Sequence, residues 1–137
     1  MQQIKVGIIG FGTVGCGTFE VLTKNREAIA NRVGAEVVVK RIADLDIESD
    51  RGVRVDQDLL TTDAMEVIDD PEIDVVVELI GGLEKAKEFI LKAMEKGKNV
   101  VTANKALLAE YGSEIFEASG RYGTSRLLRL VLAAVSP

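Results

Sequence analysis

Short apolar runs alternate along the chain with longer stretches in which apolar residues recur every three or four positions. The short runs are rich in valine and isoleucine, and nearly unbroken apolar runs of this kind are typical of strands buried in a parallel sheet. We expect strands at residues 4–9, 36–43, 73–80 and 99–103.

The stretches between these runs predict helices. We expect one long helix over residues 13–31, followed by Gly34, because glycine is favoured just after a helix end. Its apolar and small positions at helical spacing are Val14, Thr18, Val21 and Leu22. Further helices are expected at residues 62–70, 83–96 and 105–122, and residues 47–59 are expected to form a loop.

Strands that alternate with helices indicate a parallel sheet that is covered on both faces. Because crossovers between parallel strands are right-handed, the expected fold class is α/β, a doubly wound parallel sheet of the Rossmann dinucleotide-binding type. No internal repeat or linker divides the chain. We therefore expect one domain over residues 1–122 and an atypical C-terminal tail over residues 123–137.

Composition narrows the classes of function. The 137 residues carry a formal net charge of -5 and no dense run of Lys or Arg, which disfavours a nucleic-acid partner. No stretch approaches the roughly 20 apolar residues that a membrane span needs, so no membrane partner is expected. The lone Cys16 favours a reducing, cytoplasmic location. Histidine is absent from the sequence, which removes His-based catalysis and His-ligated metal sites, and no metal is expected.

A glycine-rich turn joins the first predicted strand to the first predicted helix. In such a turn the first glycine allows a tight bend, the second lets a pyrophosphate approach the backbone, and the third brings helix and strand together. The helix N-terminus adds free N–H groups and a partial positive charge. The expected cofactor-binding residues of this turn are Gly10, Phe11, Gly12, Thr13, Val14 and Gly15. The alternative is that the glycines serve only the turn and the packing.

Two residues just beyond this turn are expected to be structural. We expect Gly17 to allow close packing of the helix, and Cys16 to be a small buried helix residue rather than a nucleophile.

Acidic residues follow the second predicted strand. In a Rossmann fold a carboxylate at this position accepts hydrogen bonds from the adenosine ribose, and Asp44 is the expected residue, with Asp46 as the alternate. A solvated loop carboxylate remains the alternative interpretation. Because carboxylates repel a 2′-phosphate, NAD is slightly favoured over NADP, although Arg41 and Arg51 could turn toward that phosphate.

Two later strand ends complete the predicted crevice, since ligands bind beyond the carboxyl ends of strands in open α/β sheets. The residues expected there are Ile80, Gly81, Gly82, Thr102, Ala103 and Lys105. A lysine in a nucleotide crevice can donate a hydrogen bond to a substrate hydroxyl or to a developing oxyanion during hydride transfer. Lys105 is therefore the candidate catalytic residue, and a surface lysine at a helix start is the alternative.

The sequence resembles the cofactor domain of homoserine dehydrogenase over about residues 4–122. The resemblance lies in the order and spacing of four motifs, at residues 10–17, 43–46, 75–82 and 100–105. It implies an NAD(P)-dependent oxidoreductase that interconverts homoserine and aspartate 4-semialdehyde in threonine and methionine biosynthesis. It also implies that Lys105 is the catalytic lysine, that Thr13, Val14, Thr102 and Lys105 contact the cofactor, and that the enzyme is a homo-oligomer.

Two stretches depart from the family. Leu45 stands where some members carry an arginine for the 2′-phosphate of NADP. Residues 123–137 do not match the strand with which the family continues toward its substrate and dimerisation domain. We interpret this tail as the result of a frame change near residue 124, with a lineage-specific tail or an artificial end as alternatives. We expect the 137-residue chain alone to bind dinucleotide without useful turnover, and residues 127–135 to form a strand.

Two other functions compete with this interpretation. One is a stand-alone dinucleotide-binding module without catalysis. The other is a Rossmann oxidoreductase acting on sugars or amino acids, against which the turn at residues 102–105 argues, because sugar-oxidising relatives typically carry Glu-Lys-Pro there.

Overall fold

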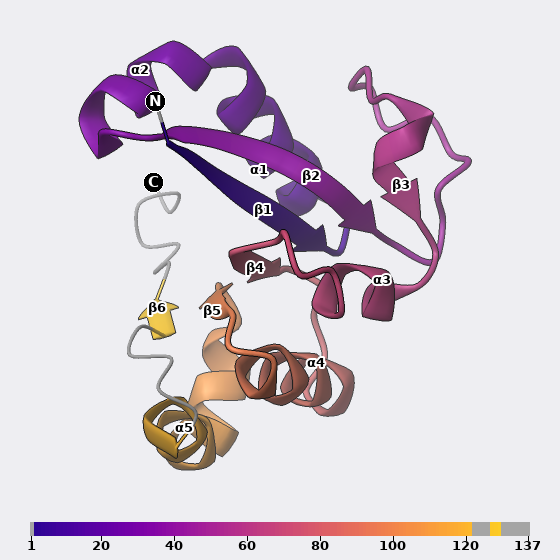
Figure 1. Cartoon of the computed structure of the whole chain (residues 1–137). Helices are drawn as coiled ribbons and strands as arrows, with labels where there is room; N and C mark the ends of the chain where they lie inside the picture. The colour runs from indigo at the N-terminus through magenta and orange to yellow at the C-terminus, as the bar shows by residue number, and fades with distance from the viewer. Residues whose placement is uncertain (1, 122–126, 130–137) are drawn as a thin grey trace.

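The computed structural model describes residues 2–121 and 127–129, and these residues build a twisted sheet between helices (Figure 1). The strands are β1 (Gln3–Ile9), β2 (Glu36–Ala43), β3 (Leu60–Thr61), β4 (Val75–Glu78), β5 (Asn99–Thr102) and β6 (Leu127–Arg129). They lie in the order β3-β2-β1-β4-β5-β6, and each neighbouring pair is parallel. The predicted doubly wound parallel sheet is confirmed.

Helices cover both faces of this sheet. They are α1 (Thr13–Lys24), α2 (Arg26–Val33), α3 (Ala64–Ile68), α4 (Glu84–Glu95) and α5 (Lys105–Arg121), with a 3-10 turn at Gln57–Leu59. One apolar cluster packs α3, α4 and α5 against the sheet and includes Ile68, Ile90, Met94, Leu107 and Ile115. A second cluster lies under α1 and includes Ile8, Phe11, Phe19 and Ile42.

The long helix predicted over residues 13–31 is wrong, because it is two helices. Asn25 separates α1 from α2, with φ -106° and ψ 23°, outside the helical region. Its N–H still bonds the carbonyl of Val21 at 3.0 Å, while its own carbonyl accepts the N–H of Ile29 at 2.9 Å. Asparagine favours such breaks because its side chain competes for backbone hydrogen bonds. Gly34 ends α2 in the left-handed conformation, as expected.

The buried face of α1 also differs from the expected one. Gly15 and Phe19 are buried, whereas Val14 and Val21 are 44% and 54% exposed. Gly15 touches the backbone of the preceding turn, and this contact orients the helix so that the residue four positions later also faces the sheet. The glycine, rather than the valines, therefore sets the rotation of α1.

Several element bounds depart from the predictions by a few residues. β3 has two residues and was not predicted, and β4 ends at Glu78 rather than at residue 80. Asp63 caps α3 by accepting the N–H of Met65 at 2.9 Å. Residues 127–129 form a strand as expected, while the rest of the predicted tail lies outside the described residues.

Within the part of the chain that the structure describes, no helix is both long enough and apolar enough to span a bilayer.

Candidate functional site

The three glycines of the turn after β1 have different surroundings. Gly10 has φ 107°, and a Cβ there would lie 2.7 Å from the carbonyl carbon of Leu79. A Cβ on Gly15 would lie 2.1 Å from the carbonyl oxygen of Gly10. At Gly12 a Cβ would meet nothing within 4 Å, and this residue is exposed. Gly10 and Gly15 are thus needed for the fold, while Gly12 leaves the backbone open to a ligand.

The N-terminus of α1 faces the same open space. Its N-cap is Gly12, with no side-chain cap, and its first turn holds no acidic residue. The first helical bond runs from the N–H of Cys16 to the carbonyl of Gly12 at 2.9 Å. Thr13 and Val14 are exposed. The helix end therefore presents its partial positive charge to solvent, as phosphate-binding helices do.

Phe11, Cys16 and Gly17, in and just after this turn, differ in burial and in their contacts. The Phe11 side chain is buried edge-on against Phe19, with ring centroids 6.0 Å apart, so only its backbone is near the open side. The Cys16 thiol donates to the Phe11 carbonyl at 3.3 Å, and burial raises its pKa, in keeping with a structural role. The packing role expected of Gly17 is wrong, because this exposed residue has nothing within 4 Å of its Cβ position.

Asp44 joins the end of β2 to the glycine turn. Its Oδ1 accepts the backbone N–H of Phe11 at 2.9 Å, and its Oδ2 accepts the N–H of Asp46 at 3.0 Å and a guanidinium N–H of Arg51 at 3.1 Å. The side chain is 21% exposed. The structure thus brings Asp44 beside the predicted pyrophosphate site, although part of its hydrogen-bonding capacity is used within the protein.

Asp46 is turned toward its own loop instead. Its carboxylate accepts the Ser49 hydroxyl at 2.6 Å and the N–H groups of Glu48 and Ser49 at 3.1 Å. These bonds, the Ser49 hydroxyl first, lower the pKa of Asp46 to about 2. Of the two candidates, Asp44 is the better placed.

The two arginines near this strand end differ in position. Arg51 stays beside Asp44 and Asp46, and its Nε is buried without a hydrogen-bond partner in the described structure. Arg41 instead donates to the carbonyl of Asp58 at 2.8 Å and pairs with Glu66 at 3.7 Å. A hollow of about 160 Å³ beside Phe11 is lined by Arg51 and by apolar residues such as Val53 and Leu60.

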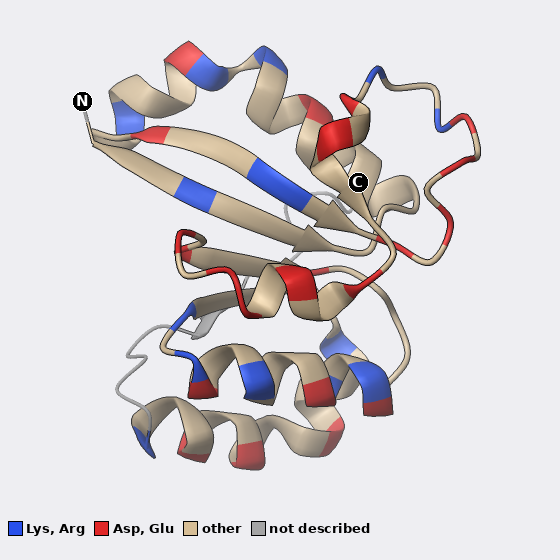
Figure 2. Ribbon diagram, turned by 45° about the vertical axis from the view of Figure 1, so that its right-hand side comes forward, with Lys and Arg blue, Asp and Glu red and all other residues tan. Residues whose placement is uncertain are grey.

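Acidic residues outnumber basic ones in the loop beside this hollow. Figure 2 shows several Asp and Glu positions and fewer Lys or Arg positions along the loop that follows β2. Leu45, which stands where some family members carry an arginine, is 92% exposed in this loop, so this position offers no positive charge to a 2′-phosphate.

The strand ends of β1, β4 and β5 meet at one edge of the sheet. Ile9 is in register with Glu78, and Glu78 with Thr102. The loop after β4 contains Ile80, which is half-buried, and Gly81 and Gly82, which are exposed with φ of 75° and 77°. The predicted residues of the glycine turn, the β4 loop and the β5 turn thus lie along this carboxyl edge.

The turn after β5 places Lys105 at the first position of α5. Lys105 is exposed, and among the described residues no hydrogen bond or ion pair holds its side chain. Ala103 is half-buried. Thr102 is fully buried and its hydroxyl donates to Glu78 at 2.6 Å, so the hydroxyl is not free for a cofactor.

Two polar residues of this region had no role in the sequence predictions. Glu78 is 1% exposed, and its Oε2 accepts the N–H of Ile80 at 2.9 Å. Asn104 donates from Nδ2 to the carbonyl of Gly82 at 2.6 Å and accepts the N–H of Leu107 at Oδ1. A carboxylate inside an otherwise apolar strand was the signal that could have identified Glu78.

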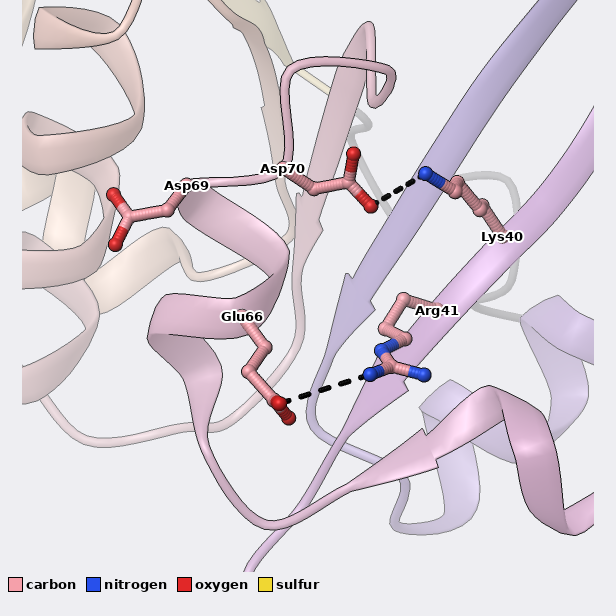
Figure 3. A pocket seen from close by; sticks show the side chains of 5 residues that line it. All are labelled: Lys40, Arg41, Glu66, Asp69 and Asp70. Atoms are coloured by element: carbon pink, nitrogen blue, oxygen red, sulfur yellow. Dashed lines mark hydrogen bonds and ion pairs between the residues drawn. The ribbon is translucent and has the colours of Figure 1, made fainter.

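A larger hollow, of about 460 Å³, lies elsewhere, and of the residues named in the sequence predictions only Arg41 lines it. Figure 3 shows Lys40 pointing to Asp70, at 2.6 Å, and Arg41 pointing to Glu66, while Asp69 points away. Its charges are largely paired with one another, which leaves the carboxyl edge as the candidate site.

Comparison with known proteins agrees with this geometry. Residues 10–128 match the family model described as homoserine dehydrogenase, NAD binding domain. The chain belongs to this family. The predicted resemblance is confirmed, as is the expectation of a domain of the NAD-binding type.

Individual homoserine dehydrogenases show how far the likeness extends. The enzyme of Methylobacillus glycogenes is 47% identical over 137 residues, which is 100% of this chain and 33% of the relative. That of Pseudomonas aeruginosa is 50% identical over 125 residues, 28% of its own length. The crystal structure of a homoserine dehydrogenase from Thiobacillus denitrificans superposes with a TM-score of 0.82 and 49% identity, covering 90% of this chain and 28% of that one. The chain thus spans 33% or less of these relatives.

Proposed function

We propose that the chain binds NAD or NADP across its carboxyl edge, as the cofactor-binding part of an enzyme that interconverts homoserine and aspartate 4-semialdehyde. The observation that carries the proposal is the uncapped N-terminus of α1 beside the open backbone of Gly12. Asp44 lies on one side of it and the turn of Lys105 on the other. Family membership supplies the substrate pair.

Each part of the edge has a proposed role. The backbone of the glycine turn, from Gly10 to Gly15, holds the pyrophosphate, and Asp44 accepts hydrogen bonds from the adenosine ribose. The proposed contacts on the nicotinamide side are Ile80, Gly81, Gly82, Thr102, Ala103 and Lys105. Of these, Thr102 would act through its backbone, because its hydroxyl is bound to Glu78.

Lys105 is the proposed catalytic residue. When bound, the nicotinamide supplies or accepts the hydride. The Lys105 ammonium would donate a hydrogen bond to the homoserine hydroxyl oxygen, or to the aldehyde oxygen in the reverse direction, and so stabilise the charge that develops there. Its exposed position, without a partner in the described residues, leaves its protons available to a substrate.

Variants of two glycines test cofactor binding. Gly12→Ala adds a methyl group where the pyrophosphate would approach, yet in the free protein this Cβ meets nothing within 4 Å. We expect the folded variant to bind NADH at least about tenfold more weakly, since it separates N–H donors from a charged acceptor. The measurement is fluorescence titration with NADH and, in parallel, NADPH.

Gly17→Ala is the matched control, because Gly17 is also exposed, lies in the helix that Gly12 precedes as its N-cap, and has nothing within 4 Å of its Cβ position. It should bind NADH as the wild type does. If the wild type binds neither dinucleotide, or if both glycine variants bind equally well, the proposed site is wrong.

A further inference from the structure

A buried carboxylate lies at the carboxyl end of β4, where no proposed contact with the cofactor uses it. Glu78 is 1% exposed, and within the described residues it has no ion pair. Burying a carboxylate costs free energy unless hydrogen bonds replace its lost hydration. Its oxygens accept two such bonds, one from Ile80 and one from Thr102.

These bonds are part of a longer connection, which we call the Glu78 bridge and which consists of Glu78, Thr102 and Asn104. The Thr102 hydroxyl donates to Glu78 at 2.6 Å and accepts the N–H of Asn104 at 3.2 Å. Asn104 then donates to the Gly82 carbonyl at 2.6 Å. The bridge therefore closes a ring that includes the loop after β4 and the turn after β5.

The bridge also sets where α5 begins. The Asn104 side chain accepts the N–H of Leu107 at 2.9 Å and so caps the helix whose first residue is Lys105. Gly81 and Gly82 supply no side chains of their own to hold their loop, and both are exposed. Among the described residues, the Asn104 bond to the Gly82 carbonyl is the side-chain hydrogen bond that holds this loop against the Lys105 turn.

The Glu78 bridge lies on only one side of the point where the strand order reverses. A dinucleotide crosses an open α/β sheet where the strand order reverses, which here is the β1–β4 boundary. Asp44 and the glycine turn lie on the β1–β2 side, whereas every member of the bridge lies on the β4–β5 side.

We propose that Glu78 is a positioning residue for the nicotinamide half of the cofactor: through Thr102 and Asn104 it fixes the β4 loop against the Lys105 turn. This inference rests on the proposed function, since it assumes that a dinucleotide binds along the carboxyl edge. It predicts that damage to the bridge weakens NADH binding and spares ADP-ribose, which has the same adenosine and pyrophosphate but no nicotinamide.

The test is calorimetric titration of the 137-residue chain with NADH and with ADP-ribose. Glu78→Gln keeps the size of the side chain but offers one acceptor and one amide group to the two donors. We expect NADH affinity to fall about tenfold, the effect of losing one charge-assisted hydrogen bond, while ADP-ribose affinity changes less than about twofold.

A second variant keeps the proposal testable if Glu78→Gln does not fold. Asn104→Asp retains the oxygen that caps α5 but loses the Nδ2 donor to Gly82, and Asn104 is only half-buried. This variant should also lower the affinity for NADH while leaving the affinity for ADP-ribose nearly unchanged. Glu66→Gln is the matched control: Glu66 also accepts a threonine hydroxyl, that of Thr61, but lies beside β2 and pairs with Arg41. It should leave the ratio of the two affinities unchanged.

The outcomes separate the two proposals. If the wild type binds neither ADP-ribose nor NADH, the proposed function itself fails. If the wild type binds both and the bridge variants lower both affinities equally, or lower neither, the dinucleotide site stands and the positioning role of Glu78 is overturned.

Discussion

At the scale of single residues, Asp44 connects two parts of the site that are far apart in sequence. Its carboxylate holds the Phe11 N–H in the glycine turn and the Arg51 guanidinium in the loop after β2. A carboxylate oxygen has room for more than one hydrogen bond. Asp44 can therefore keep the turn in place and still receive a ribose hydroxyl.

This arrangement predicts how Asp44→Ala changes cofactor choice. NADH binding should weaken by about 1–3 kcal/mol, because a charge-assisted hydrogen bond is lost. The affinity for NADPH should fall less, because the Arg51 guanidinium, released from Asp44, can then face the 2′-phosphate. Parallel fluorescence titrations measure both affinities.

Asp46→Ala is the control for this change, because the Asp46 carboxylate is bonded to Ser49 and Glu48 rather than to the glycine turn. Its NADH affinity should stay near that of the wild type. Equal losses for NADH and NADPH in Asp44→Ala would argue against a ribose contact.

Spacing along the sequence predicted which candidate residues lie at strand ends, but not the direction of their side chains. The glycines, Asp44 and Lys105 were placed at strand ends, and the structure brings those ends to one edge. The Phe11 ring and the Thr102 hydroxyl, by contrast, point into the protein. Such orientations depend on partners from other strands, as with Glu78 and Thr102, which one strand's sequence does not contain.

At the scale of elements, helix ends were harder to predict than helices. The apolar repeat that predicted this helix ends at Leu22, so it gave no signal at Asn25 that would separate α1 from α2. The rotation of α1 about its axis is set by the close approach of Gly15 to the Gly10 backbone. An apolar stripe along the helix does not set it. Strand positions were easier, since β2 spans the predicted residues.

Lys98 holds the segment that leads into β4, and its removal is expected to weaken the fold. It is 5% exposed, and its Nζ donates to the carbonyls of Asp70 and Ile73 at 2.5 and 2.9 Å. Burial lowers its pKa. Lys98→Met should destabilise the fold by about 1–3 kcal/mol, because two inward-facing carbonyls lose their donor. Urea unfolding measures the change.

Lys96→Met is the control for Lys98→Met, because the Lys96 side chain is 54% exposed and pairs with Asp69 at 3.6 Å on the surface. Exposed pairs of this kind contribute little, and the loss should stay below about 1 kcal/mol. Equal stability of the two variants would contradict the role given to Lys98.

At the scale of the whole molecule, the strand order follows from the alternation of strands and helices. Right-handed crossovers from β1 to β2 and from β4 to β5 place their helices on opposite faces, and the sheet reverses between β1 and β4. The two-residue β3 escaped prediction because so short a strand has no periodicity. It is held by pairing with β2 and by the N–H of Asp44, which donates to the Thr61 carbonyl.

The same sheet joins the two halves of the cofactor site into one unit. β1 pairs with β4 over four register positions, and the apolar cluster that contains Ile9 also contains Val76 and Val100. We therefore expect the chain to unfold in one cooperative transition. A ligand that binds only the folded state then stabilises it by an amount set by its concentration relative to its Kd, about 2.7 kcal/mol at 100 times Kd.

In the proposed binding mode NADH would span both halves of the sheet and ADP-ribose mainly the β1–β2 half, yet at equal multiples of their own Kd the two should raise Tm equally. Calorimetric scans with each ligand measure this. A second transition, or a larger rise with NADH, would show instead that the halves unfold separately, because only NADH would then stabilise the β4–β5 half directly.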